Sequence, residues 1–240
     1  MKTAVILAAG RGTRMGALTA NQPKPLLIVR RRPLIEHILC GFARAGVERA
    51  IVVTGYHGEH IETALGTGAA LGLSLTYCQQ HRAEGTAKAL ALAQPFIGAE
   101  PFAVSWGDIL VSPAFYEEFL RTFAATGCAV QLAVNEVDDP WQGAAVYVDE
   151  DWHVTKLEEK PPRGTAQTHW NNAGIFAFTP LIFRYIGELA PSPRGEYELP
   201  QAISRMVGDG RDVRAVPVRG FWCDVGTPAD LARAEQEFEA

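Results

Sequence analysis

Hydrophobic positions follow two different periods in the first part of the chain. From Lys2 to Ala9 the chain is an almost unbroken apolar run, which is typical of a strand covered on both faces in a parallel sheet. From Pro33 to Ala45 apolar residues recur at helical spacing, with a proline in the first turn and Gly46 just past the end. These patterns predict a central strand followed by a helix.

The same alternation continues downstream. It predicts further strands at residues 50–54, 73–78, 102–105 and 129–135, and further helices at residues 58–65, 85–94 and 114–125. Successive strand–helix–strand units favour an α/β fold with a doubly wound, mostly parallel sheet. Because 240 residues can bury one full core, and no linker or internal repeat divides them, we expect a single domain over residues 1–240.

The pattern changes after Gly143. Apolar segments at residues 144–148 and 154–157 flank a polar stretch, which predicts a small antiparallel hairpin over the sheet edge or its carboxyl end. The segment from Lys160 to His169 has two prolines, a glycine and no apolar periodicity. We therefore expect a mobile loop in this segment.

Composition narrows the function classes. With 48% hydrophobic and 20% charged residues, the chain has the composition of a folded enzyme rather than of a disordered protein. Its net charge of -5 argues against non-specific binding to nucleic acid or anionic membranes, which depends on a basic surface. The chain has no run of about 18 apolar residues and no signal-peptide core. We expect a cytoplasmic protein with neither nucleic-acid nor membrane partners.

The spacing of cysteines and histidines adds no metal site to this picture. The four cysteines form no CxxC pair, so we expect buried free thiols at Cys40, Cys78, Cys128 and Cys223. His57 and His60 stand three residues apart at the start of a predicted helix and could share a metal ion. Because the pattern suggests no third ligand, we expect solvent-facing histidines without a role.

The stretch LAAGRGTRMG, from Leu7 to Gly16, follows the first predicted strand. A dinucleotide-binding loop would need its third glycine where Met15 stands, and an acidic residue at the end of the strand at residues 50–54. A Walker A loop would need Gly-Lys-Ser/Thr at fixed spacing, which this stretch lacks. Both of these nucleotide-binding motifs are therefore disfavoured.

The same stretch has the chemistry of an anion site. Gly10 and Gly12 allow backbone N–H groups to approach an anion closely, and Arg11, Arg14 and Lys24 add positive charge. This much charge suits a triphosphate better than a neutral sugar or a single carboxylate. A surface turn with solvated arginines is the alternative interpretation.

Several motifs together resemble one family, the sugar-1-phosphate nucleotidylyltransferases, also called nucleotide-sugar pyrophosphorylases. After LAAGRGTRMG and PKPLL, the resemblance recurs in the family order at QHRAEGTA (80–87), WGD (106–108), EEKP (158–161), NNAGIFAF (171–178) and FWCDVGTPAD (221–230). The resemblance implies a Rossmann-like nucleotidyltransferase fold with the hairpin over the sugar site. It also implies conversion of a nucleoside triphosphate and a sugar 1-phosphate into a nucleotide-sugar and pyrophosphate.

The resemblance further implies roles for individual residues. Arg14 and Lys24 match the catalytic pair that holds the phosphates and stabilises charge on the departing pyrophosphate. Asp108 and Asp224 match two metal-binding carboxylates, which would take Mg²⁺ as the cofactor; a turn aspartate and a helix-capping residue are the alternatives. The nucleotide is expected to contact Leu7, Ala8, Ala9, Gly10, Arg11, Gly12, Thr13, Gln80, Gly85 and Thr86.

The two substrates are expected on separate segments. Gln80 matches a position whose amide, with a backbone group, reads the edge of a pyrimidine, which favours UTP or dTTP; an ordinary helix entry is the alternative. The loop after Lys160 is a candidate lid over the sugar. A salt-bridged Glu-Lys pair is the alternative for Glu159 and Lys160. The sugar phosphate is expected to contact Gly143, Glu159, Lys160, Asn172 and Gly174.

The chain departs from the family pattern in several places. Gly16-Ala17-Leu18 replaces a proline-leucine pair, Trp106 replaces a smaller or polar residue, and Pro200 replaces a hydroxyl residue, which argues against N-acetyl sugars. The chain ends soon after its last helix, so we do not expect the acyltransferase domain of some relatives.

Two alternatives stay open. One is transfer from GTP or CTP to a heptose or mannose phosphate or to phosphocholine. The other is a catalytically silent regulatory subunit that binds nucleotide-sugar. The sequence decides neither the sugar nor whether the protein is a monomer or a homo-oligomer.

Overall fold

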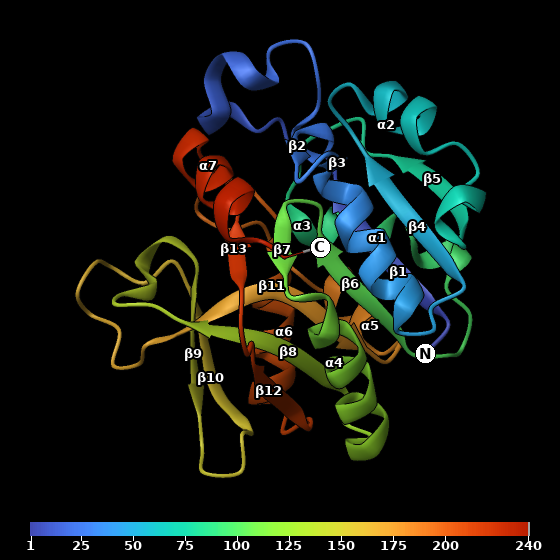
Figure 1. Ribbon diagram of the computed structural model, residues 1–240. Coiled ribbons are helices and arrows are strands. Elements are labelled where there is room, and N and C mark those ends of the chain that lie inside the picture. The colour runs from blue at the N-terminus through green and yellow to red at the C-terminus, as the bar shows by residue number, and fades with distance from the viewer. Residues whose placement is uncertain (240) are drawn as a thin grey trace.

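The computed structural model of the protein describes residues 1–239, so residue 240, the last of the expected domain, lies outside the described residues. Within this range a mixed sheet of nine strands runs through the molecule (Figure 1). Seven strands follow one path, in the order β10 (Val154–Glu159), β9 (Ala144–Val148), β11 (Trp170–Phe178), β6 (Phe102–Trp106), β1 (Thr3–Ala8), β4 (Arg49–Thr54) and β5 (Ser74–Gln79). Off this path, β8 (Val130–Glu136) pairs with β11 and with β12 (Val213–Pro217).

Four strands form the parallel half of the sheet. β1 pairs in parallel with β4 and β6, and β4 pairs in parallel with β5. All six residues of β1 are buried, because the strand is central and both faces of the sheet are covered. This burial explains the unbroken apolar run at the start of the chain, and the predicted α/β class is confirmed.

The other half of the sheet is largely antiparallel. β11 runs antiparallel to β6, β8 and β9, and β9 and β10 form the predicted hairpin. The hairpin continues the sheet at its edge through β9, so it is part of the sheet. Because β11 is antiparallel to β6, its amino end lies beside the carboxyl end of β6.

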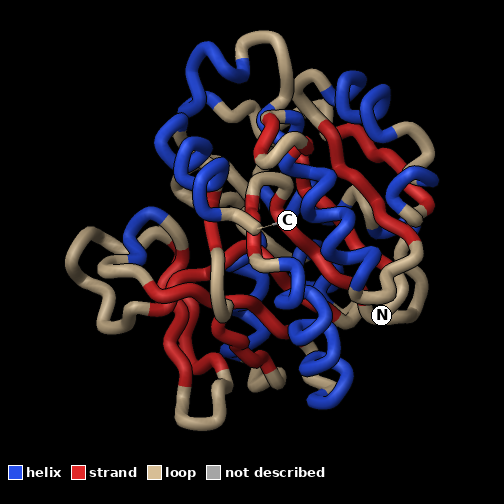
Figure 2. Tube along the Cα trace, viewed as in Figure 1, coloured by secondary structure: helices blue, strands red, loops and turns tan. Residues whose placement is uncertain are grey.

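Helices cover both faces of the sheet (Figure 2). Four of them contribute to one hydrophobic core, namely α1 (Leu34–Arg44), α2 (Gly58–Leu65), α4 (Pro113–Thr126) and α7 (Pro228–Glu237). Three contribute to the other core, namely α3 (Thr86–Ala91), α5 (Ile182–Gly187) and α6 (Leu199–Gly208).

Two expectations about local structure need correction. The helix predicted at residues 85–94 ends at Ala91, and a separate 3-10 turn follows at Gln94–Phe96, because Pro95 disfavours a continued α-helix. Cys40 is only half-buried, whereas the other three cysteines are buried as expected. No helix within residues 1–239 is long and apolar enough to cross a membrane.

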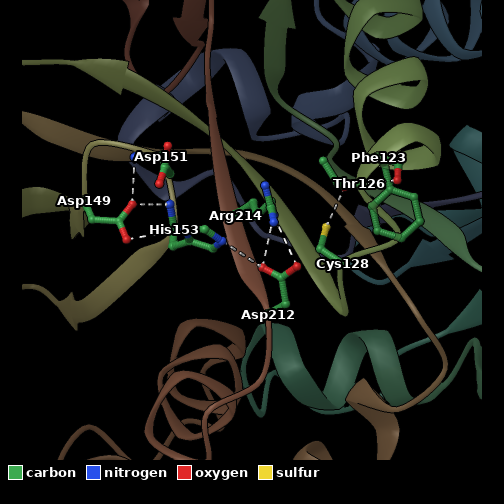
Figure 3. Close-up of polar contacts among 8 residues, drawn as sticks. All are labelled: Phe123, Thr126, Cys128, Asp149, Asp151, His153, Asp212 and Arg214. Carbon is green, nitrogen blue, oxygen red and sulfur yellow. Dashed lines mark hydrogen bonds and ion pairs between the residues drawn. The ribbon is translucent and has the colours of Figure 1, made fainter.

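A polar cluster holds the turn of the β9–β10 hairpin against β12 (Figure 3). His153 places Nδ1 3.3 Å from Asp149 and Nε2 3.7 Å from Asp212. Arg214 Nε donates to Asp212 Oδ1 over 3.1 Å, and Arg214 also forms a backbone bridge with His153. The backbone N–H of His153 donates to the Asp149 carboxylate and lowers the pKa of that group.

Candidate functional site

The ends of several strands gather the candidate residues at one edge of the sheet. β1 runs into the glycine-containing loop at residues 9–12, β5 runs into Gln80, and β6 runs into Gly107 and Asp108. Because these strands and β4 are parallel, their carboxyl ends lie at the same edge. The amino end of antiparallel β11 brings Asn172 and Gly174 to this edge as well.

The loop after β1 is shaped around the side chain of Lys24. Gly12 has a φ of +64°, and a Cβ built on it would lie 2.9 Å from the Lys24 Cβ, so a larger residue would displace Lys24. The Gly12 carbonyl accepts the Thr19 hydroxyl over 3.0 Å and the Met15 N–H over 2.9 Å. Met15 is itself buried in the core. The residue that replaces the third glycine of a dinucleotide loop therefore anchors this loop.

Lys24 lies between two carboxylates. Its side chain is 8% exposed, and its Nζ forms an ion pair with Asp108 and lies 3.7 Å from Asp224 Oδ1. Arg14, which is exposed, places Nη2 3.7 Å from Asp224 Oδ2. A nearly buried ammonium needs such partners, because an isolated charge is costly to remove from water. The structure thus brings the two expected catalytic cations and the two expected metal ligands into one cluster.

A short two-stranded ribbon carries Asp224 to this cluster. β13 (Trp222–Asp224) pairs antiparallel with β7 (Ile109–Val111), which begins directly after Asp108. Val225 N then donates to the Asp108 carbonyl over 3.0 Å. The two carboxylates come from distant parts of the chain, and this pairing fixes their separation.

The carboxyl pair has the properties of a cation site. Burial and the charge of Asp108 raise the pKa of Asp224 to about 6, although Lys24 and Arg14 oppose the shift. Asp224 Oδ1 is buried and has no hydrogen-bond partner among residues 1–239. A buried carboxylate oxygen without a donor suits a hard cation, and Mg²⁺ is held by one or two carboxylates together with phosphate oxygens. The donor set of Asp108 and Asp224 therefore fits Mg²⁺.

The expected base-reading residues lie together at the start of α3. Gln80 Nε2 donates to the Gly85 carbonyl over 3.3 Å, so the amide and this backbone segment are neighbours. The Thr86 hydroxyl already has a partner within the protein, because it accepts the Leu199 N–H over 2.9 Å at the start of α6. The Thr86 side chain therefore joins α3 to α6, and the Gln80 amide lies beside the backbone at the start of α3.

The expected sugar residues gather where the hairpin meets β11. Lys160 N donates to the Gly143 carbonyl over 2.8 Å, and a Cβ built on Gly143 would lie 2.1 Å from Asn171 Oδ1. Asn172 Oδ1 accepts the Gly174 N–H over 3.1 Å. The Asn172 Nδ2 is buried without a partner among residues 1–239, which leaves one hydrogen-bond donor free for a ligand hydroxyl.

Two residues that the sequence analysis did not single out complete the sugar side. Arg194 Nη2 lies 2.5 Å from Glu198 Oε1 and 3.3 Å from Glu159 Oε1. Burial and the charge of Glu198 raise the pKa of Glu159 to about 7, against the opposing charges of Lys160 and Arg194. In the sequence, Arg194 and Glu198 flank an irregular segment without periodicity. The sequence pattern predicts no helix directly after Glu198, so nothing there indicates that this residue stands directly before α6.

The fold and this cluster of residues define the class of α/β nucleotidyltransferases. The chain belongs to the nucleotidyl transferase family, whose model matches residues 3–240. A UTP–glucose-1-phosphate uridylyltransferase of Haloferax volcanii, AglF, is 33% identical over 247 residues, with 98% of this chain and 96% of the relative covered. The expected resemblance to sugar-1-phosphate nucleotidylyltransferases is confirmed.

Other comparisons agree with this family. The low-salt glycan biosynthesis nucleotidyltransferase Agl11 of Haloferax volcanii is 32% identical over 233 residues, which cover 97% of this chain. The chain spans only 64% of the length of that relative. Among solved structures, a protein of Bacillus anthracis assigned as a glucose-1-phosphate thymidylyltransferase, crystallised with a sucrose, has a TM-score of 0.89 and 29% identity. The match covers 98% of this chain and 94% of that chain.

Proposed function

We propose that this protein transfers a nucleotidyl group from a nucleoside triphosphate to a sugar 1-phosphate and releases pyrophosphate. The observation that carries the proposal is the position of Lys24, whose ammonium lies between Asp108 and Asp224 with Arg14 beside them. This cluster lies next to a loop whose glycines allow backbone N–H groups to contact phosphates. Residues 1–240 would act as one nucleotidyltransferase domain, in the cytoplasm.

The chemistry asked of the protein is positioning and charge neutralisation. An oxygen of the sugar phosphate attacks the α-phosphorus, and the bond from that phosphorus to the pyrophosphate oxygen breaks, with its electron pair leaving on pyrophosphate. Two polyanions must be brought together in line for this displacement. Arg14 and Lys24 supply positive charge where it develops on the leaving group.

Asp108 and Asp224 would hold Mg²⁺ in this scheme. When bound, the ion would stabilise the phosphate charge and orient the phosphate oxygens. Asp224 Oδ1 has no hydrogen-bond partner among the described residues. It is therefore the first atom that we assign as a ligand of Mg²⁺.

The nucleotide is UTP or dTTP in this proposal. Gln80 offers both an amide donor and an acceptor beside the Gly85 backbone, which matches the mixed edge of uracil or thymine. The relatives support both bases, because one is named for UTP and the similar solved structure for thymidylyl transfer. A single methyl group is worth about 1 to 3 kcal/mol in a pocket, so both bases are accepted in the proposal.

The second substrate is a hexose 1-phosphate in this proposal, and glucose 1-phosphate is the first to test because both of those relatives are named for it. Glu159 accepts hydrogen bonds from sugar hydroxyls when ionised, and Asn172 Nδ2 donates one. Lys160 has a φ of +46°, and this bend in the backbone directs Glu159 and Lys160 to different parts of the ligand.

The test is pyrophosphate release with Mg²⁺, with each nucleoside triphosphate assayed separately against glucose 1-phosphate and then other sugar 1-phosphates. Release with UTP or dTTP is the expected result. Release with GTP or CTP alone would keep the activity and overturn the role given to Gln80. If no nucleoside triphosphate gives pyrophosphate release but the protein still binds nucleotide-sugar in equilibrium dialysis, the result would favour the regulatory subunit instead.

A charge-removing variant tests the residue on which the proposal rests. Lys24→Met keeps the length of the side chain and removes its charge, so we expect kcat to fall roughly 10²- to 10³-fold, as for other groups that stabilise transition-state charge. The matched control is Lys2→Met, because Lys2 is an exposed lysine paired only with Glu48. Thermal unfolding of both variants separates lost catalysis from lost folding, and an equal loss of rate in both would contradict the assignment.

A further inference from the structure

Three potential metal ligands meet at the turn between β4 and α2. Glu59 Oε1 lies 3.4 Å from His57 Nδ1 and 3.9 Å from His60 Nε2, and one ligand atom from each residue falls within 4.8 Å of the others. The two imidazole rings stack with their centroids 5.0 Å apart. The expectation that the histidines lack a third ligand is therefore wrong, because Glu59 supplies one.

The conformation of His57 explains why helical spacing did not predict the group of His57, Glu59 and His60. His57 has a φ of +52° and precedes the first helical residue, Gly58. The left-handed turn brings the His57 ring back over the first turn of α2, where Glu59 and His60 lie. Residues 57 and 59 would not share a face of a regular helix, so helical spacing relates only the two histidines.

The donor set favours a transition metal over Mg²⁺. Two imidazole nitrogens and one carboxylate oxygen are ligands of Zn²⁺, which accepts them at about 2.0–2.2 Å and completes a tetrahedron with water. Ligand atoms around such an ion lie roughly 3.3 Å apart by that geometry. The observed ligand atoms lie within 4.8 Å of one another, and because an imidazole binds a metal in its own ring plane, the two stacked rings must rotate toward the ion. The side chains of Glu59 and His60 are 67% and 46% exposed, which leaves the site accessible from solvent.

The dipole of α2 limits the affinity of this group for a metal ion. The group lies at the amino end of α2, where the helix dipole places a partial positive charge of about half an elementary charge and opposes a cation. The Glu59 carboxylate offsets this charge, so its ionised form is essential to the site.

Tyr56 lies between this group and Arg11 of the loop to which we assigned the nucleotide. The Tyr56 ring lies against the His57 ring with centroids 4.0 Å apart, and its hydroxyl donates to the Ala20 carbonyl over 3.0 Å. The Arg11 guanidinium carbon lies 5.7 Å from the centroid of the Tyr56 ring. A ligand that fixes the His57 ring therefore acts on Tyr56 and, through it, on Arg11 and on the chain beyond the loop.

We propose that His57, Glu59 and His60 form a binding site for a divalent transition metal of the Zn²⁺ type, separate from the carboxylate pair, whose occupancy changes nucleotide affinity. The metal site stands on its own geometry. Its coupling to the nucleotide rests on the proposed function.

Metal binding is tested without catalysis. In buffer with excess Mg²⁺, which occupies oxygen sites but competes poorly for imidazole, Co²⁺ is titrated by its visible absorption and then displaced with Zn²⁺. The wild-type chain is expected to bind one Co²⁺, and His60→Ala and Glu59→Gln are each expected to weaken binding by about tenfold or more. Glu62→Gln, a carboxylate change on the same helix outside the group, should bind like wild type. Equal binding by wild type and His60→Ala would overturn the site.

Coupling is tested by nucleotide binding with and without Zn²⁺, using UTP and dTTP without the sugar phosphate. We expect Zn²⁺ to change the nucleotide Kd severalfold in wild type and to leave it unchanged in His60→Ala, which also controls for Zn²⁺ bound to the nucleotide itself. Co²⁺ binding with no Zn²⁺ effect on the Kd would retain the metal site and overturn the coupling. Absence of any nucleotide binding would count against the proposed function, since the Co²⁺ titration does not depend on it.

Discussion

Lys24 and Asp224 lie in one cluster of opposite charges. Lys24 is nearly buried, and its Nζ forms ion pairs with two carboxylates of this cluster. Asp108 is the nearer partner, and Asp224 Oδ1 lies 3.7 Å away. Asp224 in turn has a raised pKa, because burial and the neighbouring Asp108 disfavour a second negative charge. A divalent cation relieves this repulsion, so metal binding and deprotonation of Asp224 are linked.

The linkage predicts a pH dependence of metal affinity. Because the pKa of Asp224 is about 6, protons compete with Mg²⁺ below that pH. We expect the apparent Mg²⁺ affinity to fall by up to about tenfold per pH unit below pH 6 and to level off above it. The measurement is the Mg²⁺ concentration that gives half-maximal pyrophosphate release from pH 5 to 8, and a flat profile would contradict it.

The pKa of Asp224 can also be tested without metal, through the pH dependence of the free energy of unfolding. The folded pKa of Asp224 lies above the ordinary value of 3.8, so the native state binds more protons than the unfolded state between about pH 4 and 6. Its contribution to stability is therefore lost as the pH rises through this window. Asp224→Asn should remove that part of the pH dependence in chemical denaturation.

Element boundaries, rather than the middles of elements, carry the candidate site. The residues proposed to contact the nucleotide follow β1, β5 and β6, and Asp224 lies at the junction between β13 and α7. α7 begins with a capping box, in which the Thr227 hydroxyl accepts the Asp230 N–H and the Asp230 carboxylate accepts the Thr227 N–H. This cap fixes the chain three residues after Asp224.

Removing the cap tests how firmly this junction is held. Thr227→Ala leaves an unpaired N–H in the first turn of α7, so we expect a loss of about 1 kcal/mol in the free energy of unfolding. For a chain of this size that corresponds to a fall in Tm of roughly 2–4 °C. Thr227→Ser retains the hydroxyl and should behave like wild type in the same calorimetric scan; a matching fall in Thr227→Ser would indicate lost packing rather than a lost cap.

At the scale of the whole molecule, two loops contact each other beside the proposed sugar residues. They are the segment from Lys160 to His169 and the segment at residues 137–143, between β8 and β9. The segment from Lys160 to His169 contains neither helix nor strand, as the sequence predicted, and its mobility stays a prediction. The Gly164 N–H donates to Asp139 Oδ2 over 2.8 Å, and the Arg163 guanidinium lies 5.5 Å from the centre of the Trp141 ring. Figure 1 shows these loops projecting beside β9 and β10. These contacts link the two loops, and closure of the first over the sugar stays a prediction.

Limited proteolysis tests this lid. Between Lys160 and His169, Arg163 is the only lysine or arginine that is not followed by proline, and exposed loops are preferred sites of cleavage. We expect the nucleotide-sugar product to slow tryptic cleavage after Arg163 severalfold. The corresponding nucleoside diphosphate, which lacks the sugar, should protect much less. Equal cleavage rates with both ligands and with none would exclude closure over the sugar.

Local pattern was sufficient for much of this fold. The apolar run of β1, the helical spacing of α1 and the alternation up to β8 follow from burial along a few consecutive residues, and the structure places all of these elements within a few residues of the predicted ranges. The motifs also indicated Arg14, Lys24, Asp108 and Asp224, which the structure brings into one cluster. Asp108 follows β6 directly and Asp224 ends β13, whereas Arg14 and Lys24 lie in the 3-10 turns at Thr13–Thr19 and Lys24–Leu26.

Tertiary structure decided which of these segments became neighbours. Nothing local indicated that β11 would run antiparallel between β6 and β8, that β13 would pair with β7, or that Arg194 would contact Glu159. The sequence by itself determined which apolar segments are buried and where the chain turns, because hydrophobic periodicity acts over one or two turns. Strand partners, strand direction and the charged pairs that shift the pKa values of Asp224 and Glu159 depend on contacts between distant segments, and these form only when the whole core is packed.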